Sequence, residues 1–264
     1  MPEWFAVILL GIIEGITEFI PISSTGHLLI AQRFLGERSD LFTIVIQSGA
    51  VLAVLPLFRG RINQVIHHWR EKPTQDLLAK IFVAFAITGA GGLLLDKFGF
   101  KLPETITPIA LALIIGGILF IVVERRTGDA TRTVEITWGI VIAVGVAQLV
   151  AAIFPGASRS GTTILIALML GATRPAATEF SFLVGIPTML AAGGLKIFRE
   201  CTRGESNEDW SMVILGTVVS AIVSFVAVKW LLRYVQSHTF VGFGWYRIVF
   251  GALLLIWAFT LRGQ

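Results

Sequence analysis

The chain has 264 residues, of which 55% are hydrophobic and only 14% are charged, and its mean hydropathy is +0.82. Because soluble domains carry about a quarter charged residues, this composition predicts a polytopic membrane protein and argues against a soluble core. The net charge of +4 comes from dispersed basic residues without a nucleic-acid-binding motif, so no nucleic-acid partner is expected.

The apolar runs of the chain predict an all-α fold in one integral membrane domain, residues 1–264. They lie near 4–20, 41–58, 77–95, 105–123, 134–154, 162–171, 180–198, 211–232 and 245–261. Four have the form of ordinary spanning helices, which need roughly 20 apolar residues: 77–95, 105–123, 211–232 and 245–261. The other runs include some that are short or broken. The first run meets Pro21, the fifth ends at Pro155, and the run 162–171 is too short to span. Irregular backbone survives at membrane depth only where protein or a water-filled cavity covers it, so these breaks predict re-entrant segments enclosing a polar site.

Basic loops predict the orientation of the chain. Lysine and arginine gather in residues 59–72, 124–132 and 196–203. Cytoplasmic loops carry an excess of these residues, so all three loops are expected on the cytoplasmic side. Tracing the apolar runs alternately from these loops places Ser23–His27 and Pro155–Thr163 together on the outer face.

The first polar cluster lies in GIIEGITEFIPISSTGHLLI, residues 11–30, inside an almost wholly apolar frame. Glu14 and Glu18 are four residues apart and therefore share one face of a helix. Ionisable groups at membrane depth usually mark a functional site, although an amphipathic helix with both carboxylates in solvent is the alternative. Two neighbouring carboxylates suit divalent-cation binding or general acid–base work.

The sequence SSTG after Pro21 predicts a turn lined by hydroxyl groups. Ser24 and His27 are three residues apart, so the imidazole can contact the hydroxyl if a helix resumes there. A nucleophile beside a base is a recognisable catalytic arrangement. Serine and histidine are often close together in loops, so this pair alone is a weak signal.

The second polar cluster is PGASRSGTT, residues 155–163. Arg159 offers a fork of donors suited to phosphate oxygens, although an arginine that reaches the lipid headgroups is the alternative. Hydroxyl groups surround it, on Ser158, Ser160, Thr162 and Thr163. Carboxylates, hydroxyls and an imidazole opposite an arginine favour phosphoryl transfer over acyl transfer, because the charge to be stabilised is on phosphate oxygens.

The two halves of the chain, about 1–130 and 131–264, resemble each other. Residues 11–26 align with 145–161, which places Glu14 over Gln148 and Pro21 over Pro155. Residues 41–52 match 179–190 in pattern. Internal repeats in membrane proteins are often inverted, with the site at their interface, so an inverted repeat is expected, with chance similarity of apolar segments as the alternative.

These motifs resemble those of the undecaprenyl-diphosphate phosphatases, also called bacitracin-resistance proteins. The resemblance rests on EGITEFIPISSTGH (14–27) and PGASRSGTT (155–163), with weaker matches at IQSGAVLAV (46–54) and EFSFLVGIP (179–187). It implies an inverted repeat with re-entrant helices in the bacterial plasma (inner) membrane. It also implies removal of the terminal phosphate of undecaprenyl diphosphate at the outer face, with a divalent cation, Mg or Ca. This activity recycles the lipid carrier of cell-wall synthesis and confers bacitracin resistance.

The resemblance also implies roles for individual residues. Glu14 and Glu18 match the acidic pair for metal binding and acid–base work, and Arg159 matches the phosphate-binding arginine. Ser24 and His27 match the nucleophile or its activator; we expect Ser24 to attack phosphorus, with His27 as its proton-transfer partner. The hydroxyls expected to line the phosphate pocket are those of Ser23, Thr25, Ser158, Ser160 and Thr163.

The sequence is also compatible with other functions and assemblies. A polyprenyl-phosphate flippase or transporter is the main alternative, because broken helices and buried charge are common to both classes. A lipid kinase is disfavoured, since the sequence has no Walker-type loop. Polyprenyl diphosphate and membrane lipid are the expected partners, and a homodimer is a further option.

Residues outside the two polar clusters also have expected roles. Arg247, beside Trp245 and Tyr246, is expected to be an interfacial anchor. Gln47 and Glu179 are candidates for supporting the site residues. The glycine pairs 91–92, 116–117 and 193–194 are expected to permit close helix packing.

Overall fold

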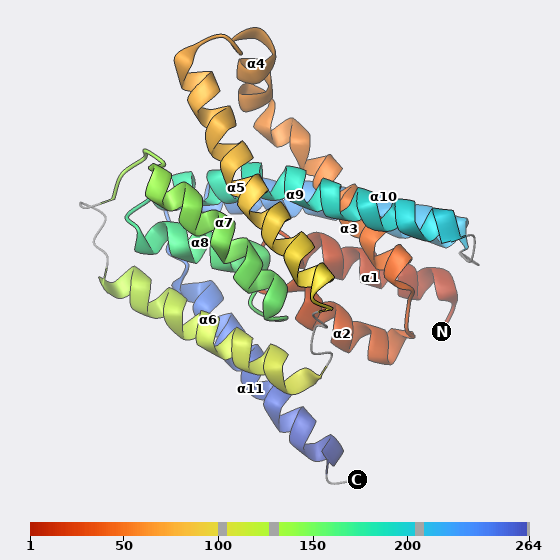
Figure 1. Cartoon of the computed structure of the whole chain (residues 1–264). Coiled ribbons are helices and arrows are strands. Elements are labelled where there is room, and N and C mark those ends of the chain that lie inside the picture. The colour runs from red at the N-terminus through yellow and green to blue at the C-terminus, as the bar shows by residue number, and fades with distance from the viewer. Residues whose placement is uncertain (100–104, 127–131, 204–208, 263–264) are drawn as a thin grey trace.

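The computed structural model describes residues 1–99, 105–126, 132–203 and 209–262, and their regular structure is helical (Figure 1). The elements are α1 (Glu3–Thr17), α2 (Ser24–Leu35), α3 (Asp40–Val54), the 3₁₀ turn η1 (Leu55–Phe58), α4 (Arg59–His67), α5 (Lys72–Lys97), α6 (Ile106–Arg126), α7 (Trp138–Ile153), α8 (Arg159–Met169), α9 (Arg174–Arg203), α10 (Trp210–Tyr234) and α11 (Val241–Arg262). The prediction of an all-α fold is confirmed.

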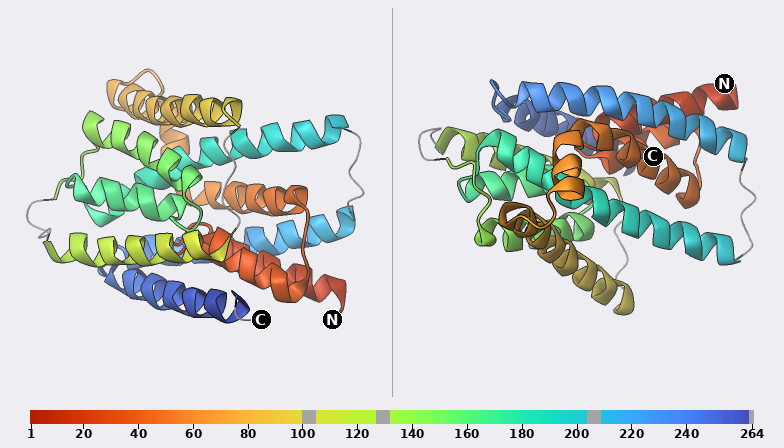
Figure 2. Two further views of the ribbon diagram at one scale, coloured as in Figure 1. Left: turned by 60° about the horizontal axis from the view of Figure 1, so that its bottom comes forward. Right: turned by 90° about the horizontal axis from the view of Figure 1, so that it is seen from above.

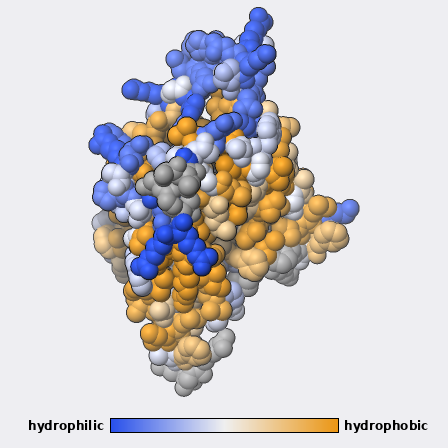
Figure 3. Space-filling model, turned by 90° about the vertical axis from the view of Figure 1, so that its left-hand side faces the viewer, coloured by the Kyte–Doolittle hydropathy of each residue, from blue (hydrophilic) through white to orange (hydrophobic). Residues whose placement is uncertain are grey.

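Six helical stretches within the described ranges are long and apolar enough to cross a membrane. They are Asp40–His67, Lys72–Lys97, Ile106–Arg126, Arg174–Arg199, Trp210–Tyr234 and Val241–Thr260. The four ordinary spans expected from the sequence are among them. Hydrophilic side chains gather at the end of the molecule that carries α4, and a broad apolar surface lies beside them (Figure 3). The chain is a multi-pass membrane protein.

Two helical hairpins, α1–α2 and α7–α8, are too short to span a membrane. The helix α1 ends at Thr17 and α7 at Ile153, each shortly before a proline. Proline lacks the N–H that a helix needs and disfavours helical backbone in the residue before it, so both helices stop there.

The second helix of each hairpin begins in the same way. Ser23 and Ser158 have positive φ angles of 75° and 68°, which non-glycine residues rarely adopt. The Oγ of Ser23 accepts from the Gly26 amide at 3.4 Å, and that of Ser158 accepts from the Gly161 amide at 3.2 Å. These serine caps satisfy amide groups that a helix start leaves free, so α2 and α8 resume directly after a sharp turn.

The long helices run between two ends of the molecule. At the α4 end, which carries α4, the end of α6 and the start of α9, Arg174 pairs with Glu124 at 2.9 Å. At the opposite end, the Asp40 end, Asp40 at the start of α3 pairs with Lys196 of α9 at 2.9 Å. Asp96 at the end of α5 pairs there with Arg199 of α9 at 3.3 Å.

This arrangement corrects one prediction. Residues 59–72 and 124–126 lie at the α4 end, but 196–203 lie at the Asp40 end, so the three basic segments do not share one side. Residues 127–131 of the second segment lie outside the described residues. The cause is the α7–α8 hairpin, which returns to the end from which it started and lets α9 cross the molecule in the opposite direction.

The two hairpins enter from opposite ends and meet in the interior. α1 and α2 open toward the Asp40 end and α7 and α8 toward the α4 end, and their tips lie together (Figures 1 and 2). The Oγ of Ser160, at the second tip, lies 3.5 Å from the carbonyl oxygen of Ile20 at the first. The two polar clusters therefore come together as predicted, but at hairpin tips inside the protein and not on one face.

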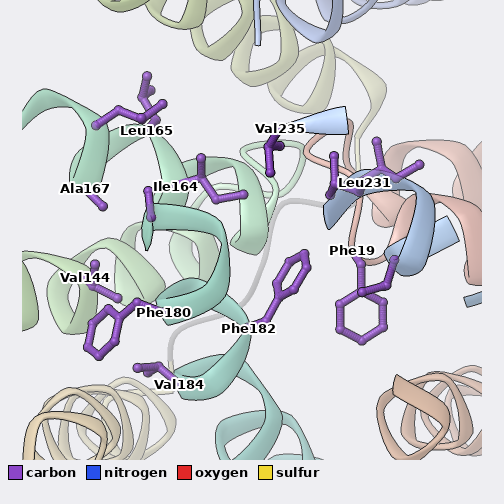
Figure 4. Packing of buried hydrophobic residues seen from close by; sticks show 14 of the residues in the cluster. Phe19, Val144, Ile164, Leu165, Ala167, Phe180, Phe182, Val184, Leu231 and Val235 are labelled. Carbon is purple, nitrogen blue, oxygen red and sulfur yellow. The ribbon is translucent and has the colours of Figure 1, made fainter. Parts of the chain in front are cut away.

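Buried aromatic rings pack around the first tip. Phe19, which follows Glu18, meets the ring of Phe182 of α9 edge to face, with centroids 5.4 Å apart (Figure 4). Phe58 of η1 packs on the same ring from another side at 6.3 Å. Each fully buried ring contributes roughly 1.5–3 kcal/mol to stability, which fixes the tip against α9.

Glycine residues allow close packing between helices, both in the hairpins and between α6 and α11. α1 packs along α10 and α7 along α5, while α6 packs along α11. A Cβ at Gly11 of α1 would lie 2.8 Å from a carbonyl oxygen of α10, and one at Gly117 would lie 2.5 Å from the Gly244 carbonyl of α11. The expected packing role holds for Gly117, Gly116, Gly91 and Gly193, whereas Gly92 and Gly194 face open space.

Candidate active site

Glu18 is the point at which the two hairpins meet. It caps the C-terminus of α1, and its side chain is only 6% exposed. Its Oε2 accepts hydrogen bonds from Ser24 Oγ at 2.7 Å and Gln47 Nε2 at 3.0 Å. Its Oε1 pairs with an Nη atom of Arg159 at 3.2 Å. One carboxylate thus joins α1, α2, α3 and α8, and the predicted support of the site by Gln47 is confirmed as a contact.

Glu14 lies one helical turn before Glu18 and is completely buried. Neither of its carboxylate oxygens has a hydrogen-bond partner among the described residues. A buried carboxylate without a partner is unfavourable unless it binds a cation or a proton. Glu14 therefore has two oxygens available to a ligand.

A cavity of about 580 Å³ connects this carboxylate to the Asp40 end. Near the hairpin tip it is lined by Glu14, Ser24, Thr25 and Gln47. Its outer part is lined by residues of the Asp40 end, among them Arg33, Glu37, Arg38, Asp40, Ile106 and Trp257. A ligand can therefore approach the tips from that end.

Arg159 keeps donors available beside Glu18. Its Nε and one of its Nη atoms are buried and have no hydrogen-bond partner in the described ranges. The guanidinium lies 6.0 Å from the Phe19 ring. A Cβ at Gly185 of α9 would lie 1.8 Å from the unpaired Nη atom, so only glycine leaves room for the side chain in this position.

The N-termini of α2 and α8 converge on Glu18. Ser24 and Arg159 are the first residues of these helices, directly after the serine caps. Helix N-termini present free amide groups and a partial positive charge, which favour a bound anion. The site therefore combines two helix N-termini and an arginine with two carboxylates.

The expected hydrogen bond between His27 and Ser24 is not formed. Its Nδ1 lies 2.7 Å from the Ser23 carbonyl, which can only accept, so Nδ1 donates and Nε2 accepts from the Tyr246 hydroxyl at 2.6 Å. The imidazole stacks on the rings of Tyr246 and Phe250 of α11. The predicted pairing fails because Ser24 Oγ donates to Glu18 while both imidazole nitrogens are engaged elsewhere.

The predicted pocket hydroxyls divide into three groups. Thr25 is exposed and lines the cavity. Ser23 and Ser158 cap helices, and their Oγ atoms accept from backbone amides. Ser160 and Thr163 are completely buried.

The two buried hydroxyls hold elements together and do not line the cavity. The Oγ of Ser160 lies 3.4 Å from the Glu18 carbonyl oxygen, which joins the hairpin tips. The Oγ1 of Thr163 lies 2.5 Å from Ser181 Oγ, which joins α8 to α9. In this structure both side chains lie outside the lining of the cavity, and their place in the phosphate pocket stays a prediction.

Glu179 and Arg247 also differ from their predictions. Glu179 lies at the α4 end, where it pairs with Arg61 at 2.6 Å, away from Glu18. Arg247 is 1% exposed and lies in the interior at the hairpin tips, so the expectation of an interfacial anchor is wrong. Its isolation in an apolar run was a usable signal, since an ionisable residue within a membrane segment marks a site by default.

The described residues include no group of three or more histidine, cysteine, aspartate or glutamate side chains placed to hold a metal ion. The site offers a smaller set of oxygen donors, the free carboxylate of Glu14 and that of Glu18 beside it. Mg²⁺ often binds one or two carboxylates and takes its other ligands from water and substrate phosphates. The donor set fits such a shared cation.

Comparisons with known proteins agree on one family. A family model described as bacitracin resistance protein BacA matches residues 7–253. An undecaprenyl-diphosphatase of Rhizobium etli is 53% identical over 257 residues, covering 96% of each chain. Undecaprenyl-diphosphatases of Rhizobium johnstonii and Xanthomonas oryzae pv. oryzae are 52% and 48% identical over 262 and 261 residues, covering at least 97% of either chain.

Proposed function

Because the chain belongs to the bacitracin resistance protein BacA family, we infer that it is an undecaprenyl-diphosphatase, an integral membrane phosphatase that releases the terminal phosphate of undecaprenyl diphosphate. The observation that carries this function is the meeting of Ser24 and Arg159 at Glu18, beside a cavity that reaches the Asp40 end. The reaction recycles the lipid carrier of cell-wall synthesis and thereby confers bacitracin resistance.

The terminal phosphate is held by Arg159 and the two helix N-termini. The unpaired Nε and Nη donors of Arg159 can bind phosphate oxygens while its other Nη atom stays on Glu18. The amides at the starts of α2 and α8 add partial positive charge. Phosphoryl transfer depends mainly on such positioning and charge stabilisation.

Ser24 is the nucleophile and Glu18 is its base. Ser24 Oγ already donates to Glu18 Oε2, so the carboxylate takes the proton as Oγ bonds to phosphorus. The bond from phosphorus to the bridging oxygen breaks, and the lipid monophosphate leaves with the electron pair. Water then cleaves the bond between Ser24 Oγ and phosphorus, the hydroxyl regains a proton, and inorganic phosphate is released.

Glu14 and Glu18 are the residues that would hold a divalent cation, Mg or Ca, together with oxygens of the diphosphate. The unpaired oxygens of buried Glu14 support this assignment. A bound cation supplies charge neutralisation on the diphosphate.

The fold is an inverted repeat, and its site faces the outer side of the bacterial plasma membrane. Hairpins that enter from opposite ends support the inversion, as does the exchange of partners in which α1 packs on α10 and α7 on α5. Basic segments 59–72 and 124–126 at the α4 end support a cytoplasmic position for that end. The cavity extends to the other end.

Phosphate release from undecaprenyl diphosphate by the purified protein in detergent tests this function. We expect release by the wild type, loss on adding a chelator, recovery with Mg²⁺ or Ca²⁺, and loss with Arg159→Ala. Denaturing the enzyme during turnover at neutral to mildly alkaline pH, where phosphoserine and phosphohistidine both survive, should trap phosphate on Ser24; phosphate on His27 would overturn the assignment of the nucleophile. A protein that moves the lipid across liposomes yet releases no phosphate would support the flippase instead.

A further inference from the structure

Arg247 of α11 joins the tips of both hairpins with one side chain. Its guanidinium is buried, and one Nη donates to the carbonyl of Pro21, at the first tip, at 3.1 Å. The other Nη donates to the carbonyls of Ala157 and Gly156, at the second tip, at 2.9 and 3.3 Å. The two turns that precede α2 and α8 thus share a single bridging group.

The rest of the guanidinium is held by α6. Nε donates to the Leu113 carbonyl at 3.3 Å, and an Nη donates to the Ala112 carbonyl at 3.3 Å. A Cβ at Gly116 of α6 would lie 2.2 Å from one Nη, and a Cβ at Gly161 of α8 would lie 2.6 Å from the other. Two glycines thus form a slot that fits the planar group.

The bridge uses backbone acceptors alone. Among the described residues no carboxylate pairs with Arg247, and all its acceptors are carbonyl oxygens. A buried cation without a carboxylate is costly, and its retention at membrane depth marks a functional requirement. Only arginine has a rigid fork of donors that can reach carbonyls on three segments at once.

We propose that Arg247 is a positioning residue that sets the two hairpin tips in register for phosphoryl transfer; this rests on the proposed function. Ser24 follows Pro21 by three positions and Arg159 follows Ala157 by two, so moving either turn moves a site residue directly. Nucleophile and phosphate-binding arginine come from different hairpins, and no peptide segment fixes their distance. The guanidinium, together with the Ser160 contact to the first tip, supplies that fixed distance.

The proposal predicts that loss of the bridge lowers kcat more than it raises KM. The substitution changes neither the lipid tail of the substrate nor the chemical identity of Arg159, so we expect most of the affinity for substrate to persist. The approach of Ser24 to phosphorus is misaligned, and a displacement of about 1 Å can cost about 10²-fold in rate. A role in folding alone would reduce the amount of folded enzyme and leave kcat per folded molecule unchanged.

The test compares Arg247→Lys, which keeps the charge and removes the fork, with Arg233→Lys, an exposed arginine of α10, as the matched control. Phosphate release is measured against substrate concentration and divided by the folded fraction from thermal unfolding in detergent. We expect kcat to fall about 10²-fold for Arg247→Lys, with KM within about threefold, and no change for Arg233→Lys. A wild-type kcat for Arg247→Lys would overturn the proposal.

A second variant covers the case in which Arg247→Lys does not fold. Gly116→Ala keeps the arginine but pushes its guanidinium out of the slot, and Gly92→Ala, whose Cβ meets open space, is its control. We expect a loss of kcat for Gly116→Ala alone, and an unchanged kcat would overturn the proposal. An inactive wild type would refute the proposed function, whereas an active wild type with active variants refutes the positioning role alone.

Discussion

The hairpins α1–α2 and α7–α8 share a backbone design and differ in the side chains that it carries. Both turn at a serine with positive φ that caps the next helix. The next position is Ser24 in one hairpin and Arg159 in the other, and both side chains contact Glu18. The backbone brings two helix starts to one carboxylate, and the side chains then divide the chemistry between attack and phosphate binding.

The first helices of the hairpins differ in the same way. Glu14 leaves both oxygens unpaired at the cavity, whereas its counterpart Gln148 donates its amide to Thr88 Oγ1 at 2.8 Å. Thr88 in turn donates to the Gly145 carbonyl at 3.1 Å. The second hairpin uses this position to fasten α7 to α5, while the first keeps it free for a ligand.

The strongest test of this division is Glu18→Gln, which leaves the shape of the meeting point intact. A neutral amide cannot take the Ser24 proton and is a poor partner for Arg159, so we expect a fall in kcat of about 10³-fold. Phosphate release measures it. Glu179→Gln, which removes a half-buried carboxylate that pairs with Arg61 at the α4 end, is the control and should act like the wild type. Equal losses in both variants would contradict the central role of Glu18.

Gly185→Ala, a substitution in α9, perturbs the side chain of Arg159 without changing a residue of the second hairpin. The added Cβ would overlap the unpaired Nη of Arg159, so the guanidinium must move, and we expect kcat/KM to fall about 10²-fold. Gly194→Ala, on the same helix but facing open space, should leave kcat/KM unchanged. Full activity of Gly185→Ala would show that the position of Arg159 is unimportant.

Sequence patterns predicted the helices, the meeting of the polar clusters and the family, because apolar run length and intact motifs carry that information. They did not predict that Arg247 lies inside, since its acceptors are carbonyls of segments distant in sequence. They also paired Ser24 with His27 from spacing alone, whereas Glu18 and Tyr246 reach these side chains through tertiary contacts. Local patterns identify which residues matter; partners across the fold decide what each one does.

Gln148→Glu tests whether position 148 has a structural role only, in contrast to its counterpart Glu14. A carboxylate cannot donate to Thr88, so we expect a loss of about 1–3 kcal/mol in unfolding free energy, read as a lower Tm in detergent. Activity per folded molecule should stay within about twofold, because this position lies outside the site. A gain in metal affinity would contradict the division between the hairpins.

Thr163→Val has the smallest expected effect. It removes the hydroxyl contact with Ser181, at a cost of about 1 kcal/mol in stability, and leaves phosphate release unchanged. Ser181→Ala should have a similar effect, and the double variant should lose little more, because the two residues share one contact. A raised KM for Thr163→Val would instead show that this hydroxyl contributes to phosphate binding.

The central claim is that the two hairpins form one site at Glu18, and a double-mutant cycle of Glu18→Gln and Arg159→Gln tests it most directly. Phosphate release by the two single variants and the double variant is compared per folded molecule. Residues that act as one unit are strongly non-additive, so the double variant should be within about threefold of the slower single variant. A double variant slowed by the product of the two single losses would contradict a shared site.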